Sequence, residues 1–129
     1  SDLIAWCVVQ DQAHSVFNGK MTIDQTAPFT EAFQKNKNLI LSPRASVDTF
    51  PKLFIANNEV KCAHGSTVSS LEPEQLNYLQ SRGIDLPAAE RMVLDGFIRQ
   101  ALEWIKNSDT RTEVETKLLG GTEEGWESA

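Results

Sequence analysis

The sequence changes character after Thr67, and this change limits the folds that the chain can adopt. Before it, short apolar runs are separated by polar corners such as Asp11–Gln12 and Asn57–Asn58, a pattern typical of short strands. After it, apolar residues recur at helical spacing. The expected fold is therefore mainly β with α, in which the strands form either coils of a β-helix or an irregular sandwich.

The strand half contains two kinds of apolar pattern. LIAWCVV is apolar on successive residues and predicts a strand covered on both faces, whereas FNGKMTI alternates like a half-exposed strand. The strands expected from these runs are Leu3–Val9, Val16–Ile23, Leu39–Leu41, Leu53–Ala56 and Val60–His64.

A first helix is expected from Pro73 to Arg82–Gly83, because proline suits the first helical turn and glycine tolerates the left-handed conformation that closes a helix. Ile84 can then fold back onto the apolar face of this helix. A third helix is expected over Thr112–Leu119, with its end at Gly120–Gly121.

A second helix is expected from Pro87 to about Lys106, with an apolar face broad enough to contact two neighbours. Phe97 and Trp104 lie on this face and are expected in the core. Gly96 costs roughly 1 kcal/mol relative to alanine inside a helix, which predicts a close backbone approach at this position.

Composition and charge exclude several classes of function. The chain of 129 residues has a formal net charge of −6 and no local cluster of basic residues, so nucleic-acid binding is not expected. No stretch approaches the roughly 18 apolar residues of a membrane span, and no leader precedes the first strand. Cys7 and Cys62 lack a CxxC spacing, which favours free thiols in a reducing, cytoplasmic setting.

The chain opens directly into the apolar run Leu3–Val9, which indicates a cut inside a longer protein. Because an exposed terminal strand can pair with a second copy, a homodimer of this fragment is a further expectation.

The segment ANNEVKCAHGST holds the strongest candidate site. Val60, Cys62 and His64 alternate and therefore point to one side of a strand, where a thiolate and an imidazole can reach one ion. Both groups suit iron, zinc, copper or the irons of a cluster, and a partner chain could complete the coordination. The alternative is that Cys62 packs as a small hydrophobe and His64 bonds to the backbone.

Other chemistry-bearing residues form no recognisable set. His14 lies at a corner with no nucleophile and orienting partner nearby, and is expected at the surface. Cys7 is expected as a buried structural thiol. The sequence contains no phosphate-binding glycine loop, HExxH pair or GxSxG elbow, so any ATP hydrolysis is expected from a partner.

Four ordered motifs resemble the SufB/SufD family of the SUF iron–sulfur cluster assembly system. They are Asn36–Ser42, Thr49–Leu53, Asn57–Thr67 and Tyr78–Ile84, and the similarity continues through AAERMVLDGF to cover about residues 15 to 100. The KCAHG version of the third motif favours SufD over SufB. Asn77 departs from the family pattern, in which an aromatic residue is common, so the details of the helical surface carry over less well.

The resemblance implies the terminal coils of a right-handed parallel β-helix in residues 1–68, a helical partner-docking domain in 69–120 and an acidic flexible tail in 121–129. It implies a non-catalytic scaffold that pairs with a SufB-like subunit and docks a SufC-like ATPase. His64 maps onto a histidine associated with iron or a nascent iron–sulfur cluster at the subunit interface, and Cys62 maps onto the neighbouring cysteine. The cluster or iron would be transient and shared with the partner.

Two hypotheses remain beside this one. The chain could be a β-helix interaction or oligomerisation module in which Cys62 and His64 are only packed, or a metal-dependent enzyme that uses His14 and His64. For the scaffold, arginine near aromatic residues on the helices is a common interface element. The expected docking residues are Tyr78, Leu79, Arg82, Gly83, Ile84, Arg91 and Phe97.

Overall fold

The computed structural model describes the backbone of residues 1–126 and the side chains of residues 1–120. Over these residues, seven strands precede three helices, which confirms the expected mixture of strands and a carboxy-terminal helical part. The chain divides into two compact units, Ser1–Ser70 and Leu71–Ala129, and each is described by itself.

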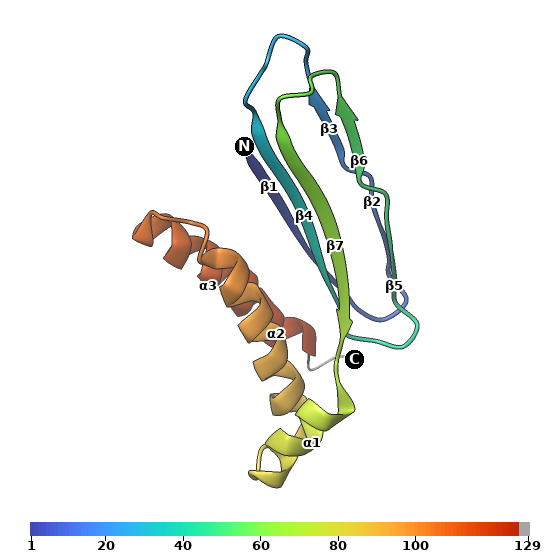
Figure 1. The fold of residues 1–129 in the computed structure, drawn as a ribbon. Coiled ribbons are helices and arrows are strands. Elements are labelled where there is room, and N and C mark those ends of the chain that lie inside the picture. The colour runs from blue at the N-terminus through green and yellow to red at the C-terminus, as the bar shows by residue number, and fades with distance from the viewer. Residues whose placement is uncertain (127–129) are drawn as a thin grey trace. The chain divides into compact units, whose positions relative to one another are not determined.

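All strand pairs in the first unit are parallel (Figure 1). The strands form three sheets, with orders β1-β4-β7, β2-β5 and β3-β6, so successive strands belong to different sheets and the fourth returns to the first. Their bounds are β1 Asp2–Val9, β2 His14–Phe17, β3 Lys20–Ile23, β4 Glu31–Ile40, β5 Ser46–Thr49, β6 Lys52–Ile55 and β7 Lys61–Ser70.

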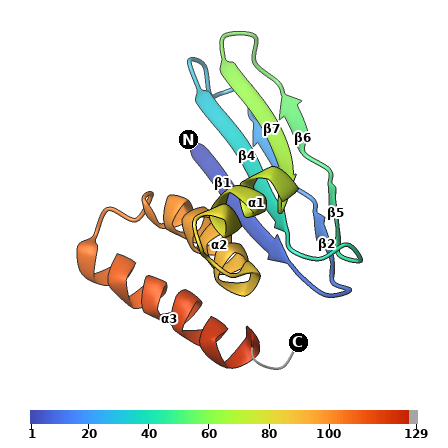
Figure 2. The same cartoon turned by 90° about the horizontal axis from the view of Figure 1, so that it is seen from below.

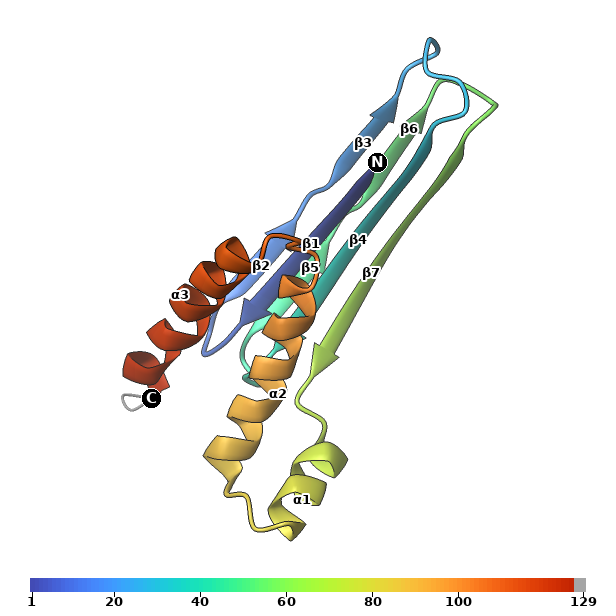
Figure 3. The same cartoon turned by 90° about the vertical axis from the view of Figure 1, so that its left-hand side faces the viewer.

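Each strand pair joins residues that are almost the same distance apart in the sequence. Asp2 pairs with Phe33, an offset of 31; His14 pairs with Ser46, an offset of 32; and Glu31 pairs with Lys61, an offset of 30. Figure 3 shows β1, β4 and β7 running side by side in this way. The unit therefore repeats one path of the chain with a constant period.

Several expected strand bounds are wrong. Val16–Ile23 is not one strand, because the chain bends at Asn18–Gly19 and divides it into β2 and β3. β4 begins at Glu31 rather than Leu39, and β5 was not expected at all. The missed segments carry alternating polar residues, which by themselves resemble a solvent-facing stretch.

The first strand is not covered on both faces as its composition suggests. Leu3 is 49% exposed and Val8 37% exposed, whereas Val9 is buried. The reason is that β1 is an outer strand of its sheet and pairs only with β4 among the described strands.

Helix α1 spans Pro73–Ser81 and ends as its sequence predicts. Gly83 has φ 86° and donates its backbone N–H to the carbonyl oxygen of Gln80 at 3.0 Å. The N–H of Ile84 bonds to the carbonyl of Leu79 at 3.3 Å, so the chain folds back over the last turn.

Helix α2 spans Leu86–Leu102 and ends before the expected Lys106. The Asp85 carboxylate accepts the N–H of Ala88 at 3.0 Å and caps its start. Trp104 follows the helix and is 61% exposed, so its expected core position is wrong. No close backbone approach exists at Gly96 either, since a Cβ built there meets no described atom within 4 Å.

Helix α3 spans Ser108–Trp126, so the expected stop at Gly120–Gly121 is wrong, and residues 127–129 of the expected flexible tail lie outside the described part. Figure 2 shows α3 alongside α2, to which it is joined by the ion pair of Arg99 with Glu115 at 2.6 Å. Over the described residues, none of the helices combines the length and apolar composition required to cross a bilayer.

Candidate functional site

Cys62 and His64 lie two residues apart on β7 and share one face of the strand. In the parallel register, Cys62 stands beside Ala32 and His64 beside Gln34 of β4. Ala32 is 3% exposed and Gln34 is 1% exposed, so the thiol and the imidazole belong to the face that β4 turns inward. Val60, which was expected to be the first residue of this strand, lies just before it.

The position of β7 leaves this pair accessible. It is the outer strand of its sheet, and His64 is exposed while Cys62 is half-buried. One thiol and one imidazole supply part of a coordination shell. Within the described residues, no group of three or more histidine, cysteine, aspartate or glutamate side chains gathers at a common point.

Beside this pair, β4 buries a row of amide side chains at Gln34, Asn36 and Asn38, each at most 2% exposed. The Asn38 amide donates to the Asn36 side-chain oxygen at 2.7 Å and to the carbonyl of Thr67 at 3.0 Å. The Ser66 hydroxyl donates to the same Asn36 oxygen at 3.4 Å. These bonds tie β4 to β7 through side chains as well as backbone.

Gln34 differs from the two asparagines, because both its amide atoms are buried without a described partner. The amide lies over Gly19, where an added Cβ would be 1.7 Å from Nε2 of Gln34 and 2.7 Å from Cε1 of Phe17. An added Cβ at position 19 would therefore have to displace the Gln34 amide or the Phe17 ring. The sequence does not predict this amide row, because alternating polar residues normally indicate the solvent-facing side of a strand.

Cys7 has a different environment from the one expected. It is half-buried rather than buried, and its Sγ donates to the hydroxyl of Ser15 at 3.3 Å. Both Cys7 and Cys62 are free thiols.

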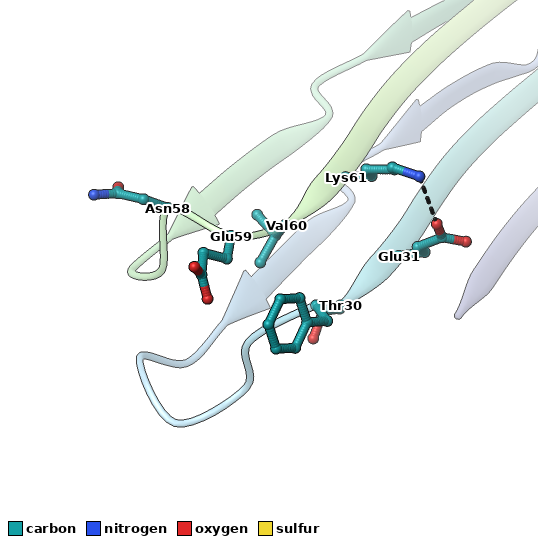
Figure 4. Close-up of a pocket in the computed structure, with 7 residues that line it drawn as sticks. Thr30, Glu31, Asn58, Glu59, Val60 and Lys61 are labelled. Atoms are coloured by element: carbon teal, nitrogen blue, oxygen red, sulfur yellow. Dashed lines mark hydrogen bonds and ion pairs between the residues drawn. The ribbon is translucent and has the colours of Figure 1, made fainter.

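A shallow hollow of about 380 Å³ lies where the turns before β4 and β7 meet, lined by residues 29–31 and 58–61 (Figure 4). Lys61 pairs with Glu31 across it at 3.1 Å. Phe29 is 78% exposed in a left-handed conformation with φ 59°, and its N–H bonds to the carbonyl of Glu59 at 2.7 Å. The hollow is thus held by contacts between the two turns.

The expected docking residues fall into two groups on the helices. Tyr78, Arg82 and Gly83 are exposed, and the Arg82 guanidinium lies 5.2 Å from the centre of the Tyr78 ring. Leu79, Ile84, Arg91 and Phe97 are half-buried. Arg91 in particular is engaged within the unit, since it donates to the carbonyl of Leu119 at 3.1 Å.

The expectation that His14 has no nucleophile and orienting partner is wrong. Nδ1 of His14 lies 2.6 Å from the Ser46 hydroxyl, and Nε2 lies 3.3 Å from Oδ2 of Asp48. Ser46 is 32 residues away in the sequence, so only the pairing of β2 with β5 brings it to His14. No short-range motif signals this arrangement.

Comparison with known proteins gives consistent matches. A family model described as "SUF system FeS cluster assembly, SufBD core domain" matches residues 1–97. An iron-sulfur cluster assembly SufBD family protein of Synechocystis sp. is 41% identical over 99 residues, or 77% of this chain and 22% of that protein. The iron-sulfur cluster assembly protein SufD of Escherichia coli is 35% identical over 111 residues, or 86% of this chain and 26% of that protein.

The chloroplastic protein ABCI7 of Arabidopsis thaliana is 36% identical over 115 residues, or 88% of this chain and 24% of that protein. The chain thus spans about a quarter of the length of the curated relatives that it matches. Since the family model covers most of the chain, including the β7 strand and helix α1, the chain belongs to the SufB/SufD family of the SUF iron–sulfur cluster assembly system.

Proposed function

We propose that this chain is the carboxy-terminal part of a SufD-like scaffold subunit, which pairs with a SufB-like subunit, docks a SufC-like ATPase and handles iron or a nascent cluster transiently. In this role the chain hydrolyses no ATP, since ATP hydrolysis belongs to the partner. The observation that carries the proposal is the placement of Cys62 and His64 on one face of the outer strand β7.

The first unit is proposed to be the last coils of a right-handed parallel β-helix. The nearly constant offset of 30 to 32 residues between paired strands supports the β-helix, because coils of similar length return each strand to its own sheet. The buried amide bonds between β4 and β7 add a side-chain ladder of the kind that neighbouring coils share.

In this scaffold, iron or the cluster is cargo, and His64 with Cys62 offers two of its ligands while the SufB-like partner supplies the others. An imidazole and a thiolate both bind iron, and a second chain can reach them because His64 is exposed and Cys62 is half-buried. Neither residue alone is expected to hold iron tightly.

The cargo site is tested by anaerobic titration of ferrous iron into the complex of this chain with a SufB-like subunit. We expect His64→Ala to lower iron retention strongly, and His14→Gln, which changes the only other histidine, to leave it unchanged. If replacing both Cys62 and His64 leaves retention intact, the chain is an interaction module without a cargo site.

The docking role is assigned to the exposed Tyr78–Arg82 pair on α1. A pull-down of the chain with purified SufC-like ATPase is expected to weaken when both residues are changed to alanine, because each offers a large exposed surface to a partner. Lys117→Ala on α3 is the matched control, since among the residues with described side chains this exposed lysine pairs with Glu113 of its own helix. No capture of the wild-type chain would remove this part of the proposal.

A further inference from the structure

We propose that Ser46, His14 and Asp48 form a nucleophilic site on the exposed face of β2 and β5, which accepts acyl groups from short-chain activated esters. The site is separate from the cargo role proposed for β7. It rests on a geometry in which one imidazole stands between a hydroxyl and a carboxylate.

The strand pairing builds this arrangement. His14 stands beside Ser46 in the parallel register, and Val16 stands beside Asp48 two residues further on. His14, Ser46 and Asp48 are all exposed, while the alternate residues of both strands are half-buried. The three side chains therefore share the outward face, where a substrate can reach them.

The neighbours of the imidazole decide which nitrogen carries its proton. A carboxylate can only accept, so Asp48 at 3.3 Å from Nε2 favours the neutral tautomer that has its proton on Nε2. Nδ1 then has a free lone pair, and it lies 2.6 Å from the Ser46 hydroxyl. His14 is thus placed as a general base for Ser46, and Asp48 as its orienting partner.

A donor for the developing oxyanion is available next to the nucleophile. The N–H of Ser46 bonds to Ala13 on the β2 side at 3.0 Å, and the N–H of Phe50 bonds to Phe17 on the same side at 2.7 Å. Backbone N–H groups alternate between the two edges of a strand, so the N–H of Val47 must point away from β2. That edge of β5 pairs with no described strand. The N–H of the residue after a nucleophilic serine is a recurring oxyanion donor.

The surroundings indicate the class of acyl group. Val16 in β2 is 57% exposed, and Phe50, which directly follows β5, is 51% exposed. These apolar surfaces can cover a short aliphatic chain but offer no enclosed cavity for a large substrate. Acetyl to butyryl esters with a good leaving group match this face.

The reaction balances without any cofactor. The Oγ of Ser46 attacks the ester carbonyl carbon and forms a new C–O bond while its proton passes to Nδ1 of His14. The bond from carbon to the leaving alkoxide then breaks, and the alkoxide takes that proton. Water releases the acid in the second half by the same proton route and restores the hydroxyl.

The test is acid-quenched incubation of the whole chain with p-nitrophenyl acetate, followed by mapping of acetylated serines by mass spectrometry. We expect Ser46 to acetylate much faster than Ser69, an exposed serine of β7 whose partner in the sheet is Leu39. His14→Gln should slow acetylation of Ser46 roughly 100-fold, the low end for a positioned general base. Asp48→Asn should slow it less.

Acetylation of Ser46 at the rate of Ser69 would overturn the proposal, as would an unchanged rate in a folded His14→Gln chain. Circular dichroism checks that each variant is folded. If His14→Gln fails to fold, the ratio of Ser46 to Ser69 in the wild-type chain and its fall in Asp48→Asn still decide the outcome.

Discussion

The two units of the chain are stabilised in different ways. The strand unit Ser1–Ser70 is tied together by parallel pairs between residues 30 to 32 apart and by buried amides, so its order depends on contacts that are distant in sequence. The helical unit is ordered instead by caps and turns that form between residues close in sequence. Its fully buried apolar side chains are Ala89, Leu94 and Leu102 among the described residues, and α1 buries none.

The order of the strand unit thus depends on its register, whereas that of the helical unit depends on local caps and a small apolar core. Both units leave large apolar side chains exposed, among them Val16 and Phe29 in the first. Tyr78, Met92 and Trp104 are each at least 50% exposed. Exposed aromatic side chains of this kind are common at protein interfaces. Variants that act on one unit and leave the other unchanged test this difference.

The largest effect is expected from Leu94→Ala, because Leu94 is 3% exposed in the small core of the helical unit. The cavity and the lost burial should lower the free energy of unfolding by about 3 kcal/mol. Hydrogen exchange measured by mass spectrometry should rise in α1–α3 and stay constant in β1–β7. Equal acceleration in both units would show that they unfold as one.

Gly19→Ala should act on the strand unit alone. Its Cβ would be 1.7 Å from the buried Gln34 amide, so side chains must shift, and we expect a loss of about 2 kcal/mol in unfolding free energy by urea denaturation. Gly65→Ala is the control for a strand glycine, because a Cβ there meets no described atom within 4 Å. A double variant with Gln34→Ala should recover part of the loss, and full additivity would contradict the contact.

Gly96→Ala should stabilise the helical unit by about 1 kcal/mol, because alanine favours a helix and no described atom obstructs the new methyl group. A higher melting temperature with slower exchange in α2 is the expected result. Destabilisation would mean that a neighbour closes on Gly96.

The smallest effect concerns Asp24, whose carboxylate accepts the Thr26 N–H at 2.9 Å and the Thr26 hydroxyl at 2.8 Å. These bonds, the backbone one first, lower the pKa of Asp24. The stabilisation is present above the pKa of the unfolded chain and is lost as the pH falls through the lower folded value. An NMR titration should show this low pKa, and Thr26→Ala, which removes the hydroxyl and keeps the backbone N–H, should raise it in part; an unchanged value would exclude the hydroxyl bond as a cause.

Local signals in the sequence predicted several features correctly. Pro73 and Gly83 mark the helix that the structure has at Pro73–Ser81, and the apolar runs locate β1 and β6 closely. The family motifs also identified the SufB/SufD family. Each of these depends on residues near one another in the chain, or on a pattern that needs no knowledge of the fold.

The sequence did not predict β5, the first half of β4 or the buried amide row, because polar residues at alternate positions also describe an exposed strand. It placed Cys62 and His64 on one side of a strand but not beside Ala32 and Gln34. It also left His14 without partners.

Composition, caps and motifs are properties of neighbouring residues, so the amino-acid sequence alone indicates the change from strands to helices, the bounds of α1 and the family of the chain. The burial of polar side chains such as Gln34, and the contacts of Ser46 and Asp48 with His14, depend instead on how distant strands pair. The physical reason is that a parallel pair joins strands about 30 residues apart, and a shift of one residue would turn every side chain to the other face.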